Sequence, residues 1–361
     1  MSLFALVPIL YLVGNAYVFW RGKQALQAQP KGRRLLFALV YWLGALSIFP
    51  EFLWHSASSP VYLLRLLHQV GTGWMVFTLY MVLALLAFDV LRLCRLRIKG
   101  SFWVALLLTL VSLGYGYYHY KHPVIKEIDI LIDKPLASPL KIVAISDVHL
   151  GYGTGKQQLA DYVRLINAQQ PDLILIAGDL IDNDLTPVKR ERMQDELNAL
   201  RAPLGIYMVP GNHDYFGGIE ACEEFIRWTD ICLLRDSLVQ LPNGIQLIGR
   251  DDRRNRSRLP LSTLAEQADA SRPIILLDHQ PYDLATTARC GIDLQFSGHT
   301  HHGQIWPLTW LTDYLFELSY GYRAVGESQI FVSSGLSLWG PPFRIGTDSE
   351  VVVFRLTSNL Q

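Results

Sequence analysis

Four long runs of apolar residues dominate the first third of the chain. They cover residues 3–20, 35–54, 72–91 and 102–118. Each run is close to the roughly 20 residues that a helix needs to cross about 30 Å of hydrocarbon, and each is apolar on every face. A buried core helix would explain one such run but not four in succession. The pattern therefore predicts four transmembrane helices within residues 1–120.

The loops between these runs differ in positive charge. Five Lys or Arg residues follow the first run, one lies between the second and third, and four follow the third. Short loops rich in Lys and Arg stay cytoplasmic, so both termini and the large C-terminal part are expected on the extracytoplasmic side of the cell membrane. An aromatic belt at the outer interface is then expected from Tyr115, Tyr117, Tyr118 and Tyr120. Loss of one span would reverse this assignment.

From residue 121 the pattern changes to short apolar runs that alternate with amphipathic stretches. Strands are predicted at residues 141–145, 173–177, 205–209, 245–248, 274–277, 293–296, 330–332 and 351–356. Helices are predicted at residues 156–169, 187–200, 219–228, 261–268 and 282–288. This alternation indicates one α/β layered domain over residues 121–361, with a largely buried sheet.

Charge separates the same two parts. The net charge of zero hides ten Lys/Arg against two Asp/Glu in residues 1–120, and 22 against 30 in residues 121–361. A nucleic-acid partner is not expected, because the second part is acidic. The four cysteines include no CxxC pair, which argues against a zinc ribbon. Cys222 and Cys232 are either bridged outside the cytoplasm or buried as free thiols.

Several predicted strands end directly in a polar cluster. The clusters read SDVH from Ser146, GDLID from Gly178, PGNHD from Pro210, DH from Asp278 and GHTH from Gly298. In an open α/β sheet, ligands bind beyond the carboxyl ends of the strands. We therefore expect these polar side chains to meet at one edge of the sheet.

The clusters supply seven potential metal ligands, namely Asp147, His149, Asp179, Asn212, His279, His299 and His301. Imidazole, carboxylate and amide groups without thiolate suit Mn, Zn or Fe. One catalytic ion usually takes three or four protein ligands, so seven donors predict two divalent metal ions that share Asp179. Two cations about 3.5–4 Å apart can hold a phosphoryl group and a hydroxide for in-line attack.

The ordered string DxH…GDxxD…GNHD…H…GHTH resembles the calcineurin-like metallophosphoesterase superfamily, most closely its bacterial branch of membrane-attached or exported phosphodiesterases. The resemblance covers residues 141–361 and implies a sandwich of two mixed β-sheets flanked by helices. It implies one ion held by Asp147, His149, Asp179 and His301. It implies a second ion held by Asp179, Asn212, His279 and His299.

The resemblance also assigns the catalytic roles. His213 matches the residue that stabilises or protonates the leaving oxygen, and Asp182 matches the acid that orients it. A histidine one residue past a ligand can reach the substrate without joining the metal shell. Asp214 is expected to fix the loop. His302 stands where this branch usually has Gly, and it either adds a contact or lines the mouth of the site.

The leading hypothesis is an integral-membrane, metal-dependent phosphoric ester hydrolase. It would cleave a phosphomonoester or phosphodiester of a small molecule or lipid by metal-activated hydroxide. One alternative is a pyrophosphatase that acts on a nucleotide- or lipid-linked substrate. Another is a membrane sensor or scaffold that retains the fold without activity. No protein partner is inferred.

Three further features have two interpretations each. The run GRDDRRNRSR from Gly249 is either an anion funnel for a phosphorylated substrate or a solvated loop partly neutralised by Asp251 and Asp252, which the sequence favours. Trp306 and Trp310 either meet a lipid or belong to the core. Arg344 is a possible residue of the site, but the sequence does not place it.

Overall fold

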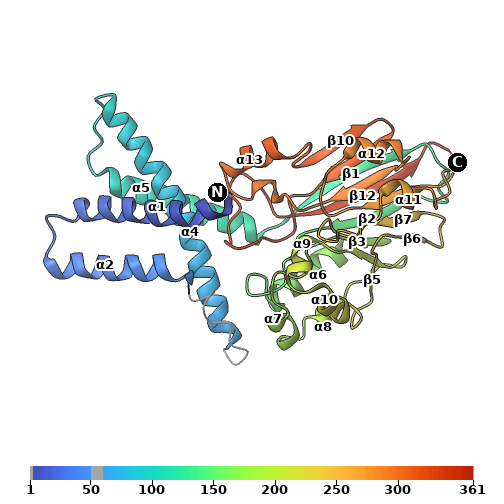
Figure 1. Cartoon of the computed structure of the whole chain (residues 1–361), viewed down its shortest axis with the longest axis horizontal. Helices are drawn as coiled ribbons and strands as arrows, with labels where there is room; N and C mark the ends of the chain where they lie inside the picture. Colours follow the sequence, from blue (N-terminus) through green and yellow to red (C-terminus); the bar gives the residue numbers. More distant parts are fainter. Residues whose placement is uncertain (1–2, 50–59, 361) are drawn as a thin grey trace. The chain divides into compact units, whose positions relative to one another are not determined.

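The computed structural model describes residues 3–49 and 60–360. Within this part, the chain forms two compact units (Figure 1). The helical unit extends to Tyr118 and also includes Gly340–Ile345. The second unit comprises His119–Trp339 and the C-terminal segment from Gly346. Each unit is described by itself below.

The helical unit contains four long helices in the described residues: α1 (Leu3–Ala25), α2 (Lys31–Leu46), α4 (Val61–Leu93) and α5 (Ser101–Lys121). Only α4 and α5 are long and apolar enough, by length and composition, to cross a bilayer. With 16 residues, α2 is about 24 Å long at 1.5 Å per residue, which is less than about 30 Å of hydrocarbon. In α1, the uncharged part with described side chains spans residues 6–20 and ends before Arg21 and Lys23.

The prediction of four spans is therefore corrected to two candidate spans in the described residues. The end of the predicted second span, residues 50–54, lies outside the described residues.

A buried asparagine joins three of the helices. Asn15 of α1 accepts hydrogen bonds at Oδ1 from the Tyr41 hydroxyl of α2 (3.0 Å) and from Trp74 Nε1 of α4 (3.0 Å). Arg21 of α1 also pairs with Asp89 of α4 at 2.6 Å. A buried amide that makes several hydrogen bonds fixes the register of packed helices better than apolar contacts alone.

The second unit contains two six-stranded mixed sheets (Figure 1). The first sheet has the order β1 (Val124–Ile132), β12 (Glu350–Ser358), β2 (Leu140–Ile145), β3 (Leu173–Ala177), β4 (Ile206–Val209) and β5 (Ile231–Leu233). The second has the order β10 (Gly321–Val325), β11 (Ser328–Val332), β9 (Leu294–Ser297), β8 (Ile274–Leu277), β7 (Gln246–Gly249) and β6 (Ser237–Gln240). Strands β2 to β5 run parallel, as do β7, β8, β9 and β11.

Helices accompany both sheets. They are α6 (Lys156–Ala168), α7 (Leu185–Arg190), α8 (Gln194–Leu197), α9 (Asn212–Phe216), α10 (Ile219–Ile226), α11 (Leu261–Ala265), α12 (Leu284–Arg289), the 3₁₀ helix η1 (His301–Gly303) and α13 (Leu308–Leu315).

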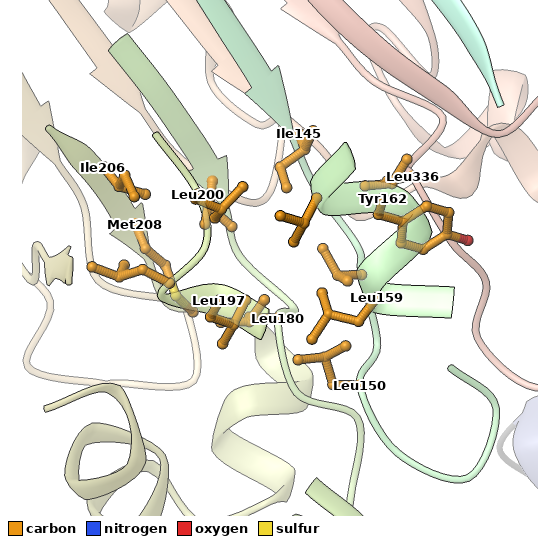
Figure 2. Close-up of a cluster of buried hydrophobic side chains, with 14 of the residues drawn as sticks. Ile145, Leu150, Leu159, Tyr162, Leu180, Leu197, Leu200, Ile206, Met208 and Leu336 are labelled. Atoms are coloured by element: carbon orange, nitrogen blue, oxygen red, sulfur yellow. The ribbon is translucent and has the colours of Figure 1, made fainter. Parts of the chain in front are cut away.

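The central strands are buried on both faces, because side chains alternate along a strand. In β2, Ile142 and Ala144 join a core that contains residues of both sheets and therefore lies between them. Val143 and Ile145 join a different core on the outer face, which α6, α8 and α10 cover. Figure 2 shows Ile145 of this core with Leu159 and Tyr162 of α6 and Leu197 of α8. The α/β fold with two mixed sheets, expected from the family resemblance, is confirmed.

The eight predicted strands all form, within a few residues of their expected ends. Strand β1 was not predicted, because its sequence VIKEIDILI carries charges at the exposed edge of the sheet. The predicted helix over residues 187–200 is divided into α7 and α8, since Arg192 between them adopts a positive φ of 53°. Strands β5, β6 and β10 and the short helices α9, η1 and α13 were also missed.

Candidate metal centre

The seven predicted donors follow the carboxyl ends of five strands. They lie after β2 (Asp147, His149), β3 (Asp179), β4 (Asn212), β8 (His279) and β9 (His299, His301). The donors were expected at the edge of one sheet, but strands of both sheets contribute them. His279 Nδ1 lies 2.8 Å from the carbonyl oxygen of Ala177, so a hydrogen bond joins the two sheets at the site itself.

Asp147, His149 and His301 form a first group, whose ligand atoms all lie within 4.8 Å of one another. His149 Nε2 is 3.1 Å from His301 Nε2, and Asp147 Oδ1 is 3.4 Å from His301 Nε2. Asp179 Oδ2 lies 3.7 Å from His149 Nε2. The four side chains assigned to one ion by the family resemblance thus face one another.

Asp179, His279 and His299 form a second group of the same kind. Asp179 Oδ2 lies 3.2 Å from His279 Nε2, and Asn212 Oδ1 lies 3.2 Å from the same nitrogen. The same oxygen of Asp179 therefore faces an imidazole nitrogen of each group. The structure brings all seven predicted donors together.

These separations fit the ligands of metal ions. Ligand bonds of about 2.0–2.2 Å at tetrahedral angles place neighbouring ligand atoms roughly 3.3–3.6 Å apart. Asp147 and Asp179 are also buried, and their ion-pair partners in the described residues are histidines, without Lys or Arg. A buried carboxylate is costly unless it is paired or coordinates a metal, so this residue set suits divalent cations.

The glycines in the motifs GD, GN and GH leave the space that these ligands occupy. The nearest atom of a donor side chain to an added Cβ would be His279 Nδ1 at Gly178 (2.6 Å), Asp179 Oδ1 at Gly211 (2.1 Å) and Asp147 Oδ2 at Gly298 (2.3 Å). Any side chain at these positions would displace a ligand. The close approach of backbone to ligand explains why each motif contains glycine.

Five of the seven donors adopt the left-handed backbone conformation. Their φ angles are 55° at Asp147, 47° at His149, 51° at Asp179, 72° at His299 and 49° at His301. This conformation costs a residue other than glycine about 1–2 kcal/mol, and such strain concentrates at functional sites. The sharp turns after the strands aim each side chain at the common centre.

The ionisable side chains of the centre shift one another's pKa. Burial disfavours the protonated His279 ring, but the Asp179 carboxylate outweighs this effect and raises the pKa of His279 well above its usual range. Burial and the neighbouring His279 lower the pKa of His299 to about 3. Burial raises the pKa of Asp147. Such mutual dependence is typical of active sites.

His213 lies beside the donors and is oriented by Asp182. Its Nδ1 is 2.9 Å from Asp182 Oδ1, and its backbone N–H donates to Asp179 Oδ1 at 2.8 Å. Its ligand atom also falls within 4.8 Å of those of His149 and Asp179. The His213 ring contacts two exposed aromatic rings, which sequence reasoning missed. They belong to Phe216 and Trp339.

Asp214 and His302 lie outside the two groups of donors. Asp214 accepts hydrogen bonds from the backbone N–H groups of Ile181 (3.0 Å) and Gly211 (2.8 Å), which matches its expected role of fixing the loop. His302 stacks on Tyr320 at 4.6 Å between ring centroids and belongs to neither group of donors. Its interpretation as a lining residue is favoured over an extra ligand.

Tyr120, the two cysteines and Arg344 belong to neither group of donors. Tyr120 is buried and bonded to Gln158, so its predicted place in the aromatic belt is wrong. Cys222 is a buried free thiol and Cys232 an exposed one, so the two are not bridged. Arg344 belongs to the helical unit, where its backbone N–H donates to a carbonyl of α5.

Trp306 and Trp310 are exposed, so their interpretation as core residues is wrong. Helix α13, which contains Trp310, also exposes Tyr314 and Leu315. The next residue, Phe316, contacts the ring of His299 at 5.8 Å. An exposed apolar surface therefore adjoins the second group of donors.

The arginine-rich run after β7 is not neutralised as expected. Asp251 accepts hydrogen bonds from Arg235 and Tyr215, and Asp252 accepts one from Gln280 at 2.7 Å. Both carboxylates are buried, and in the described part of the chain neither forms an ion pair with an arginine of the run. The interpretation as a loop neutralised by its own two acids is therefore wrong.

Comparison with known proteins agrees with this geometry. The model of the calcineurin-like phosphoesterase family matches residues 140–303. A metallophosphoesterase of Helicobacter pylori is 38% identical over 257 residues, which cover 68% of each chain. A metallophosphoesterase of Campylobacter jejuni is 32% identical over 270 residues, covering 73% of this chain and 71% of the relative.

A Danio rerio protein named transmembrane protein with metallophosphoesterase domain is 32% identical over 275 residues. That match covers 70% of this chain and 62% of the fish protein. The chain belongs to the calcineurin-like phosphoesterase family.

Proposed function

We propose that this protein is a membrane-anchored phosphoesterase that hydrolyses phosphomonoesters or phosphodiesters at a centre of two divalent ions. Membership of the family implies a metal-dependent phosphoester hydrolase. The observation that carries the two-ion proposal is the position of Asp179 Oδ2, which lies 3.7 Å from His149 Nε2 and 3.2 Å from His279 Nε2. One carboxylate oxygen between two imidazole groups suits a bridging ligand.

The ligands follow from the two groups. We assign one ion to Asp147, His149, Asp179 and His301, and the other to Asp179, Asn212, His279 and His299. Their chemistry suits Mn, Zn or Fe. When bound, the ions supply Lewis-acid activation of the phosphoryl group and of the attacking water.

His213 is the residue that acts on the leaving group in this proposal. Burial alone would raise the pKa of Asp182, but the nearby His149 ring, 3.6 Å away, and the hydrogen bond with His213 outweigh it and lower the pKa. Asp182 therefore stays ionised and holds the proton of His213 on Nδ1. This leaves Nε2 of His213 to hold or deliver a proton at the leaving oxygen, which needs it when the ester bond breaks.

Cleavage of a pyrophosphate linked to a lipid or nucleotide is the second candidate. The exposed apolar surface of α13 favours it, since Trp310 is 65% exposed and Tyr314 86% exposed. Phe316 connects this surface to His299. An apolar substituent on the substrate would bury that surface. A sensor or scaffold without activity needs no such convergence of seven donors, five of them buried.

The membrane anchor is proposed from α4 and α5. Apolar side chains on α5 face outward, with Leu107 and Val111 each 62% exposed, as expected for lipid contact. Relatives in Danio rerio and Bos taurus carry the name transmembrane protein. The loop between α4 and α5 contains three Lys or Arg residues, and Arg92 lies in the last turn of α4, so this loop is expected in the cytoplasm and the catalytic unit outside.

Substitution of His213 tests the proposed chemistry. His213→Gln should leave the metal content unchanged and lower kcat about 10²–10⁴-fold on alkyl phosphates, the usual effect of losing a positioned acid. The loss should be smaller on p-nitrophenyl phosphate, whose leaving group needs little protonation. His302→Gln is the matched control and should retain wild-type kcat. Loss of metal from His213→Gln, or an unchanged rate on alkyl phosphates, would contradict the assignment.

A further inference from the structure

A polar pocket of about 270 Å³ lies between the arginine-rich loop after β7 and the segment after β8. Four arginines line it, namely Arg250, Arg253, Arg256 and Arg258. The opposite wall includes Asp278, Gln280 and Asp283. The volume is close to the lower end of the range for small-molecule sites and is ample for a phosphate group.

The pocket carries excess positive charge. Asp278 Oδ2 forms ion pairs with both Arg250, at 3.0 Å, and Arg258. Asp283 lies 3.9 Å from Arg253 and is largely exposed, which weakens that pair. Arg256 has no carboxylate within ion-pair distance among the residues that the structure describes. Four guanidinium groups thus face two carboxylates.

Part of this charge is buried without full compensation. The side chains of Arg250 and Arg258 are 15% and 9% exposed. The Nε atoms of both are buried without a hydrogen-bond partner in the described structure. Burial lowers the pKa of Arg250 despite its ion pair with Asp278. Two buried cations share the carboxylate of Asp278, and Asp236 adds only a weaker charge interaction with Arg250, so a bound anion would supply further balancing charge.

The loop is held in this arrangement by its own acids. Asp251 accepts hydrogen bonds at Oδ2 from Arg235 (Nε 3.0 Å, Nη2 2.9 Å) and Asn255 (2.9 Å), and at Oδ1 from the Tyr215 hydroxyl (2.7 Å). Because these bonds occupy Asp251, it leaves the arginines of the pocket unneutralised. A fixed loop presents its guanidinium groups at a lower entropic cost than a mobile one.

The pocket is connected to the metal centre through the segment after β8. Asp278 and Gln280, which line it, are the chain neighbours of His279, and successive Cα atoms are only about 3.8 Å apart. Arg254 of the same loop does not line the pocket, but its guanidinium lies 4.3 Å from the centroid of the Phe216 ring, which contacts His213 at 5.2 Å. The loop and the segment after β8 therefore both connect the pocket to residues of the centre.

We propose that this pocket binds a second phosphate group of the substrate, so that preferred substrates carry one phosphate for hydrolysis and another for recognition. Planar guanidinium groups match phosphate oxygens with paired hydrogen bonds, and four of them line a space of phosphate size. The inference rests on the proposed phosphoesterase function and names its substrate class.

Binding to the chelator-treated full-length protein tests the pocket without the metals. Inorganic pyrophosphate is titrated by calorimetry into detergent-purified wild type and into Arg256→Gln, which changes an exposed side chain and leaves the core intact. We expect at least tenfold weaker binding in the variant and in Arg258→Met. Arg192→Gln, an exposed arginine elsewhere, is the control and should bind as wild type does. Equal affinity in all four proteins, or no binding to wild type, would overturn the pocket.

Kinetics separate a substrate phosphate from free phosphate. The metal-loaded proteins are compared on the p-nitrophenyl ester of thymidine 5′-phosphate and on the same ester with an added 3′-phosphate. Wild type should prefer the second ester, and Arg256→Gln should lose at least tenfold in that preference while its rate on the first ester stays unchanged. An unaltered preference with weakened pyrophosphate binding would identify a free-phosphate site and refute the substrate class. No turnover of either ester would instead refute the phosphoesterase function.

Discussion

Gly211 in the motif GNHD lies where a single methyl group should disable the metal centre. An added Cβ would lie 2.1 Å from Asp179 Oδ1 and 2.5 Å from the backbone nitrogen of Asp179. Gly211 itself has φ −111° and ψ −179°, a conformation open to alanine. Gly211→Ala therefore introduces no backbone strain of its own, and its effect comes from the displaced ligand.

The size of the effect follows from the distances. To restore ordinary contact, the Asp179 carboxylate must move by about 1 Å, and a misplacement of about 1 Å can cost 10²-fold in rate. The hydrogen bond from the His213 backbone N–H to Asp179 Oδ1, now 2.8 Å, would also be disturbed. Overpacking of this kind costs about 1–3 kcal/mol of stability. We expect kcat to fall at least 10²-fold, with the fold retained.

Metal analysis and kcat on p-nitrophenyl phosphate, measured on the same samples, provide the assay. Gly217→Ala is the matched control, because Gly217 ends the same short helix with φ −69° and an added Cβ there would meet ordinary contacts of 3.5–3.6 Å. The control should retain both metal and activity. Wild-type metal content and rate in Gly211→Ala would refute the placement of Asp179 against this glycine.

Two further predictions concern stability and sidedness. Burial alone would raise the pKa of Asp251, but hydrogen bonds from Tyr215 and Arg235 outweigh it and lower the pKa. The ionised Asp251 carboxylate therefore stabilises the fold above about pH 4, and this stabilisation is lost as the pH falls further. Asp251→Asn should reduce stability by about 1–3 kcal/mol at pH 7, and a wild-type advantage in Tm that persists unchanged at pH 3 would contradict this sign. For sidedness, an alkaline phosphatase fused to the C-terminus should be active and a fluorescent protein there dark; the reverse result would place the catalytic unit in the cytoplasm.

The sequence allowed the donors to be predicted because polar side chains interrupt apolar runs at strand ends. Asp147 and Asp179 stand immediately after strands whose burial on both faces makes them continuous apolar runs, a strong signal for parallel sheets. The glycines before Asp179, Asn212 and His299 reinforced this signal. The structure adds why they are glycines, since each lies against the side chain of a donor residue.

Other features depend on contacts between distant parts of the chain. The pairing of β1 with β12 joins residues more than 200 positions apart, and no local pattern reports it. The ion pairs of the arginine-rich loop also depend on such distant contacts, because Asp251 pairs with Arg235 and not with the arginines next to it in the sequence. The number of spans was overestimated because apolar composition does not show where a helix ends, as α2 does at Leu46.

The central claim is that one carboxylate, Asp179, links two ions. Electron paramagnetic resonance of the Mn²⁺-loaded protein tests it directly, since two Mn²⁺ ions about 3.5–4 Å apart are magnetically coupled and isolated ions are not. The account predicts two Mn²⁺ per chain with a coupled spectrum, which is lost together with metal in Asp179→Asn. A single uncoupled Mn²⁺ per chain in the wild-type protein, or a coupled pair that survives in Asp179→Asn, would contradict it.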